Sequence, residues 1–123
     1  LVREAHVALC PNRGECGTNL VAMECRASCV PTILSANTGH LDLVGDDVCF
    51  VLREQRPARP TEQFAGTEGW GDSSVEEILA VLEAVHADQA EAERRGRAAA
   101  GLLAGMAWEH QIDHLLVTLS DLY

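Results

Sequence analysis

The chain has 123 residues, a formal net charge of −10 and a hydrophobic fraction of 47%. That length suits one domain, and the apolar content excludes an intrinsically disordered chain. The acidic excess argues against nucleic acid as a partner, because phosphates are bound by clustered Lys and Arg. No apolar run approaches the roughly 20 residues of a transmembrane helix, so none is expected. Five cysteines without paired CxxC spacing predict reduced thiols in a cytoplasmic protein.

The first part of the chain predicts a strand followed by a helix. Residues 6–10 form a short apolar run that a Pro-Asn-Arg-Gly sequence stops, which is typical of a buried strand ending in a loop. A helix follows, and either Thr18 or Asn19 can cap it. We expect a carboxylate on its inward face, because four residues recur at helical spacing: Leu20, Met23, Glu24 and Ala27.

Two further strands complete a parallel pattern. Residues 30–35 predict a second strand, with Pro31 near its start, where a missing N–H is tolerated. A turn over 37–39 and a short helical turn over 40–44 lead to a third buried strand at 48–52. The fold class is therefore α/β, a Rossmann-like parallel sheet of about three strands with C-terminal helices.

The second half of the chain predicts one long loop and then helices. Residues 53–72 contain Pro, Gly and polar residues without a sustained period, as in loops retained for function. Ser74 with Glu77 three residues later forms a capping box before an amphipathic helix. A further helix is expected from Gln89 to about Met106.

The last segment, residues 108–123, carries an apolar stripe at helical spacing. We expect most of these side chains to pack within the core of this domain. The alternative is a helix that crosses to another domain. His110 and His114 lie on one helical face but lack a third ligand, so no metal is expected. The stripe consists of Trp108, Ile112, Leu115, Leu116, Leu119 and Tyr123.

The strongest candidate for a binding site is the glycine-bearing loop at residues 12–24, which leads from the first strand into the helix. Unpaired N–H groups at a helix N-terminus favour a phosphate, and Gly17 permits close backbone approach. In open α/β sheets, ligands bind beyond the carboxyl ends of the strands, where this loop is expected. Glu15 and Glu24 suit a ligand rich in hydroxyl donors, such as sugar and ribose. Alternatively, Glu15 caps or neutralises the helix start and Glu24 is half exposed.

Three blocks of the sequence resemble the donor-site segment of the retaining, two-domain glycosyltransferases that use nucleotide-activated sugars. The family pattern is a Glu, a glycine-containing loop and a second Glu in a helix, followed by a Val-Pro strand and a glycine turn. Here the blocks are residues 15–24, 30–35 and 38–42. The resemblance implies that residues 1–123 are a single nucleotide-sugar-binding, C-terminal half of a glycosyltransferase of GT-B architecture. The N-terminal acceptor domain is then missing, and the fragment is expected to be inactive alone.

The resemblance also assigns roles to individual positions. Glu15 would be the catalytic-site carboxylate that contacts the transferred sugar, and Glu24 would accept hydrogen bonds from the ribose. No cofactor and no metal is implied, since the nucleotide-sugar is the substrate. Backbone amides for the sugar or diphosphate would come from Gly17, Thr18, Asn19 and Leu20. Further donor-proximal candidates are Asn37, Thr38, Gly39 and His40.

The chain departs from the family pattern in several places. Eight residues separate Glu15 from Glu24, one more than in the family. Arg26, Ser28 and Cys29 stand where Met, Ala or Cys, and Gly are typical, and a Cys in place of Gly is expected to hinder a tight turn. The upstream Arg and Lys that hold the diphosphate are not within these residues. The alternative function is a degenerate, non-catalytic Rossmann-like nucleotide-binding or interaction module.

Overall fold

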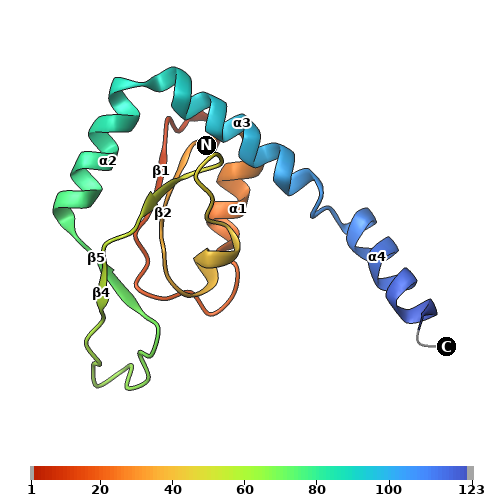
Figure 1. The fold of residues 1–123 in the computed structure, drawn as a ribbon, viewed down its shortest axis with the longest axis horizontal. Coiled ribbons are helices and arrows are strands. Elements are labelled where there is room, and N and C mark those ends of the chain that lie inside the picture. Colours follow the sequence, from red (N-terminus) through yellow and green to blue (C-terminus); the bar gives the residue numbers. More distant parts are fainter. Residues whose placement is uncertain (1, 122–123) are drawn as a thin grey trace.

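The centre of the fold is a three-stranded parallel sheet (Figure 1). In the computed structural model, which describes residues 2–121, β1 (Ala8–Cys10), β2 (Thr32–Ser35) and β3 (Phe50–Leu52) lie side by side in that order. All residues of the middle strand are buried. The predicted α/β class, with a Rossmann-like parallel sheet of three strands, is confirmed. Each strand is shorter than the apolar run that predicted it.

Helices cover both faces of this sheet (Figure 1). They are α1 (Leu20–Ala27), α2 (Val75–Ala87) and α3 (Gln89–Ala104). Leu34 of β2 packs in one apolar cluster with Ala22 of α1. Its neighbour Ile33 packs in a second cluster with Val85 of α2 and Ala92 of α3. Successive strand residues point to opposite faces, so β2 contributes to both halves of the core.

The inward face of α1 differs from the predicted one. Its buried residues are Ala22, Cys25 and Arg26, whereas Leu20 is 71% exposed and Glu24 is also exposed. The expectation of an inward carboxylate was therefore wrong. Small side chains at 22 and 25 let α1 approach the sheet closely, and the buried set has the same i, i+3, i+4 spacing as the predicted one. Periodicity alone could not decide which of the two sets of residues faces inward, because the buried set includes a charged residue.

The predicted loop at residues 53–72 contains a pair of short antiparallel strands, β4 (Gln55–Pro57) and β5 (Gly71–Ser73). Each strand has only three residues, and Pro or Gly lies in each, so neither shows a recognisable strand pattern. The chain between them forms a protruding loop at the lower end of Figure 1. Two 3-10 helices, η1 (Val2–Glu4) and η2 (Thr38–Asp42), complete the body, and η2 begins two residues before the helical turn predicted at 40–44.

The predicted start of α2 is confirmed, but only half of its capping box forms. Ser74 Oγ accepts a hydrogen bond from the backbone N–H of Glu77 at 3.1 Å. The Glu77 carboxylate accepts instead from the backbone N–H groups of Arg53, at 2.7 Å, and Glu54, at 3.0 Å. The start of α2 is thereby tied to the segment that leaves β3. Asp88 then caps α3 in the same way, through the N–H of Glu91.

The last helix, α4 (Trp108–Ser120), extends away from the body as an arm (Figure 1). None of its residues is buried, and Trp108 is 81% exposed. The expectation that most of these side chains pack in the core of the domain was therefore wrong for residues 108–121, and Tyr123 lies outside the described residues. Within residues 2–121, no helix is long and apolar enough to cross a membrane.

Candidate functional site

The predicted site lies where the loop after β1 meets the turn after β2. Parallel strands place these two segments at the same edge of the sheet. The backbone N–H of Glu15 donates to Thr38 Oγ1 at 2.7 Å, and the N–H of Gly39 donates to the Glu15 carbonyl at 3.3 Å. Asn37 Nδ2 donates to the carbonyl of Asn12 at 2.8 Å. The structure thus brings together two of the sequence blocks that the resemblance singled out.

The contact between the two segments is close enough to require a glycine. A Cβ added to Gly39 would collide with the carbonyl oxygen of Gly17. Thr38, directly before it, has a φ of 40°, a left-handed backbone conformation that residues with a side chain rarely adopt. Strain of this kind persists only where the surroundings enforce it, and here the hydrogen bond to Glu15 does so.

The start of α1 presents unpaired backbone donors. Asn19 is the N-cap, and its Oδ1 accepts from the N–H of Ala22 at 3.0 Å. The N–H groups of Gly17, Thr18, Leu20 and Val21 have no acceptor within the described part of the chain. These four residues are exposed. The positive end of the helix dipole and these donors together form a site suited to an anion.

His40 does not face this surface, because its side chain is completely buried. Ser35 Oγ donates its proton to the Asn12 carbonyl at 2.8 Å, so it accepts from His40 Nδ1–H at 3.0 Å. Nε2 then accepts from Asn19 Nδ2 at 2.9 Å. Both ring nitrogens are used by the neutral imidazole, and burial lowers the pKa of His40 below its usual value. His40 and the Asn19 side chain therefore position the loop, whereas neither is free to contact a ligand.

This buried histidine predicts acid sensitivity. The ordinary pKa of 6.5 applies in the unfolded chain, and the folded-state pKa is lower, so the unfolded chain binds the proton first. The contribution of neutral His40 to stability is complete above about pH 6.5. It is lost as the pH falls toward the folded-state pKa, by up to about 1.4 kcal/mol for each pH unit. We expect the free energy of unfolding, measured with urea, to fall between pH 7.5 and pH 5.5, and to fall less in His40→Gln than in the wild type. Equal falls in the two proteins would contradict this role.

The two predicted carboxylates are both accessible at the surface. Glu15 is half-buried, and Asn12 Nδ2 donates to its Oε2 at 3.3 Å. Glu24 is exposed on α1, one turn beyond the unpaired amides of its start. An exposed Glu24 is compatible with both predicted alternatives, the ribose contact and the half-exposed position. Both groups remain able to accept hydrogen bonds from hydroxyl groups of a ligand.

Sequence reasoning missed the contribution of the β4–β5 segment. The indole of Trp70 lies against Gly14, where an added Cβ would stand 2.6 Å from the ring. Gln55 Oε1 accepts from Asn37 Nδ2 at 2.8 Å, which ties β4 to the turn after β2. A cavity of about 490 Å³ opens between that turn and this segment, with Thr38 and Trp70 in its lining. The single Trp between two glycines in a polar loop was the sequence signal that could have indicated the contribution of the β4–β5 segment.

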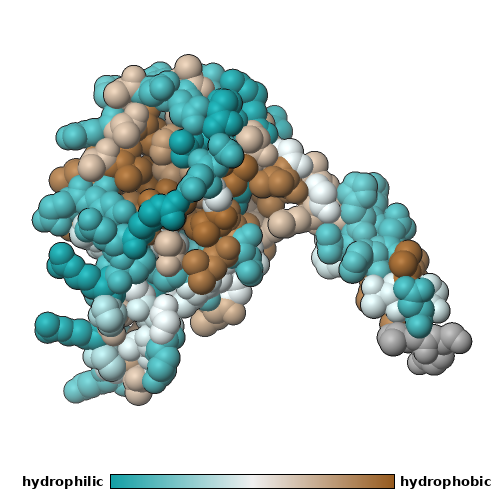
Figure 2. Space-filling model, in the orientation of Figure 1, coloured by the Kyte–Doolittle hydropathy of each residue, from teal (hydrophilic) through white to brown (hydrophobic). Residues whose placement is uncertain are grey.

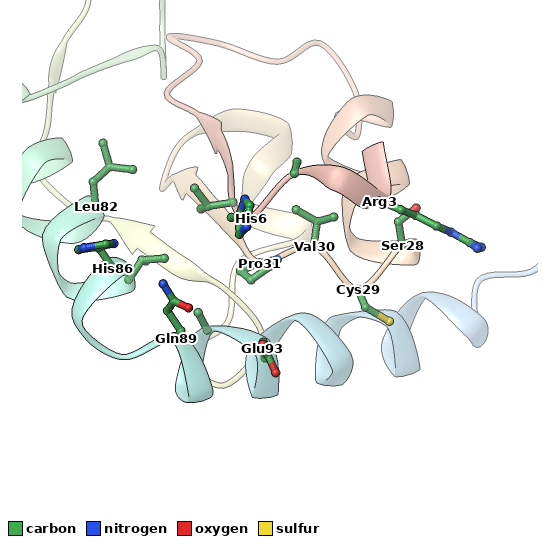
Figure 3. A pocket seen from close by; sticks show the side chains of 14 residues that line it. Arg3, His6, Ser28, Cys29, Val30, Pro31, Leu82, His86, Gln89 and Glu93 are labelled. Carbon is green, nitrogen blue, oxygen red and sulfur yellow. The ribbon is translucent and has the colours of Figure 1, made fainter. Parts of the chain in front are cut away.

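A larger cavity of about 580 Å³ lies at the opposite, amino end of the strands (Figure 3). Cys29, Pro31 and His86 line it, and none of the predicted site residues does. The described residues contain no group of three His, Cys, Asp or Glu side chains that could hold a metal ion. The anion-binding geometry and the larger cavity are therefore separate features of the chain.

Searches against protein-family models, curated proteins and solved structures found no match to this chain.

Proposed function

We propose that the chain is the nucleotide-sugar-binding half of a retaining glycosyltransferase. The observation that carries this proposal is the set of unpaired backbone amides at Gly17, Thr18, Leu20 and Val21, which lie at the carboxyl edge of a parallel sheet. The neighbouring carboxylates provide the acceptors that a sugar and a ribose need. An anionic ligand rich in hydroxyl groups matches both features.

Each group has a distinct role in this proposal. The amides at the start of α1 bind the diphosphate, which gains charge as it leaves the sugar, and fixed N–H dipoles aimed at it lower the barrier. Glu15 holds the transferred sugar, and Glu24 accepts from the ribose hydroxyls. Thr38 and Gly39 hold the Glu15 backbone in position through the two hydrogen bonds between the segments. No metal and no cofactor takes part.

We further propose that catalysis needs an acceptor-binding domain as a partner. The apolar side chains exposed along α4 offer a surface for that contact, with Ile112 at 48% and Leu116 at 59% exposure. A cytoplasmic location suits the five free cysteines, two of which, Cys16 and Cys29, are exposed. Sugar transfer by the 123-residue chain alone would contradict the need for a partner.

The alternative is a degenerate module that binds a nucleotide without transferring sugar. Cys29 favours it, because this residue has a φ of 62° at the turn after α1, where glycine is the favoured residue. The carbonyl of Cys29 also lies against Gly96 of α3, so the strained turn cannot relax easily. A chain that no longer needs catalytic precision tolerates such a substitution.

Nucleotide binding tests the donor site, which the proposed function and the alternative share. We expect isothermal titration calorimetry to detect UDP, GDP or ADP binding to the chain, with Glu24→Ala weakening the affinity by about tenfold, the loss of one charged hydrogen bond. Glu109→Ala, which removes an exposed carboxylate on α4, is the matched control and leaves the affinity unchanged. Equal affinities in wild type and Glu24→Ala, or no binding of any diphosphate, would contradict the assignment.

A further inference from the structure

Arg26 carries a charge that the described chain does not neutralise. Arg26 is only 1% exposed, although arginine is among the side chains least often buried without a partner. Nη1 donates to the Leu43 carbonyl at 2.7 Å, while Nε has no hydrogen-bond partner. Among residues 2–121, no carboxylate forms an ion pair with this guanidinium. Burial lowers the pKa of Arg26 accordingly.

A buried, unpaired guanidinium is costly to the fold. Moving an ion out of water carries a penalty of several kcal/mol in real proteins, which a counter-charge and full hydrogen bonding are needed to offset. One carbonyl and one unpaired N–H do not supply that compensation. The geometry therefore indicates that an anionic group belongs next to this side chain.

A cavity of about 430 Å³ adjoins Arg26. It lies between α1, the end of α3 and the loop at residues 42–48. Its lining is largely apolar, and two of the lining residues, Leu102 and Met106, are 55% and 47% exposed. Figure 2 shows hydrophobic surface on this flank of the body, beside the start of the α4 arm. The volume lies within the range of small-molecule sites.

The rim of the cavity selects among anions. Asp42, Asp46 and Asp47 belong to its lining, and all three are exposed. Asp46 pairs with Arg53, and the carboxylate of Asp47 lies 3.8 Å from Arg94. These acidic groups repel an anion with two or more charges more strongly than one with a single charge. Arg26, which belongs to the lining, and the apolar walls match a ligand with one carboxylate and an apolar body.

We propose that this cavity binds a small monocarboxylate with an apolar body, its carboxylate on Arg26 and its chain against Leu102, Leu103 and Met106. This site is distinct from the loop that starts α1 and does not depend on the proposed transferase function. The ligand supplies the counter-charge for the guanidinium and covers the exposed apolar wall.

Hexanoate and hexanol are the probes, because they share a chain and differ in the carboxylate. At matched ionic strength, we expect saturating hexanoate to raise the melting temperature of the 123-residue chain by about 2 °C or more. Hexanol and inorganic phosphate are expected to have a smaller effect. Arg26→Met keeps an unbranched side chain and removes a buried charge, so it is expected to fold and to lose the hexanoate effect. Arg97→Met, at an exposed arginine of α3, is the control that retains it.

A second variant and a second measurement keep the test independent of how Arg26→Met folds. Leu103→Trp fills the cavity without altering the charge and is expected to abolish the hexanoate effect. In nitrogen-proton NMR spectra of the wild type, hexanoate is expected to shift one arginine Nε–H resonance. The same resonance is expected to be present in the spectrum of Arg97→Met. Any one of four results would overturn the proposal. They are no stabilisation of wild type by hexanoate, equal stabilisation of folded Arg26→Met, equal stabilisation of Leu103→Trp, and hexanol or phosphate stabilising the wild type as much as hexanoate does.

Discussion

Replacing Gly39 with Ala is expected to lower the free energy of unfolding by about 1 to 3 kcal/mol, the usual effect of overpacking a close contact. The added Cβ would collide with the Gly17 carbonyl oxygen, a backbone atom that cannot rotate away. The loop that carries Glu15 must then move from Thr38, so nucleoside diphosphate affinity is expected to fall as well. Urea unfolding and calorimetric titration measure the two effects.

Gly17→Ala is the matched control for this contact. An added Cβ at Gly17 would have no described heavy atom within 4 Å, so stability is expected to stay within about 0.5 kcal/mol of wild type. If a diphosphate approaches this backbone, as proposed, the same variant weakens its binding without destabilising the fold. An unchanged stability in Gly39→Ala would show that the two segments are not held as closely as described.

Replacing Gly96 with Ala is expected to separate α3 from the turn that follows α1. The new Cβ would collide with the carbonyl oxygen of Cys29 and stand 3.2 Å from the backbone nitrogen of Pro31. In a helix interior, Ala is favoured over Gly by about 1 kcal/mol, which opposes the effect of the clash. Comparison with a second glycine of the same helix removes that contribution.

Gly101 is that second glycine, because an added Cβ there would meet no described heavy atom within 4 Å. Gly101→Ala is expected to stabilise the chain by about 1 kcal/mol through helix propensity alone. Gly96→Ala is expected to be less stable than Gly101→Ala by about 1 to 3 kcal/mol, which thermal or urea unfolding measures. Equal stabilities of the two variants would rule out a close approach of α3 to Cys29.

The parallel sheet was predictable because its strands are apolar runs bounded by turn residues, and the strand–helix alternation implies a parallel order. The cap at Ser74 was predictable because Glu77 follows it three positions later, whereas Asn19 was one of two candidates for the cap of α1. The β4–β5 pair was not, since its two strands lie far apart in sequence and each has three residues. Which face of α1 turns inward depends on packing against β2 and α3, which periodicity does not encode.

The location of the candidate site was predictable, whereas the state of its side chains was not. Parallel topology places the loop after β1 beside the turn after β2, where Glu15 and Thr38 meet. The burial of His40 follows from a hydrogen-bond chain through Ser35 and Asn12, which only the folded arrangement closes. The unpaired charge at Arg26 is likewise a property of the packing around it. Nucleotide-sugar binding remains a prediction until diphosphate titration is done.

The arm formed by α4 has a consequence for local opening. A helix of 13 residues without buried side chains has little beyond its own backbone hydrogen bonds to hold it, and isolated helices of that length are marginal in water. Its amide protons are therefore expected to exchange with solvent far faster than those of the buried strand β2. When another surface covers the arm, that exchange slows. Hydrogen exchange at α4 thus provides a direct signal of partner engagement.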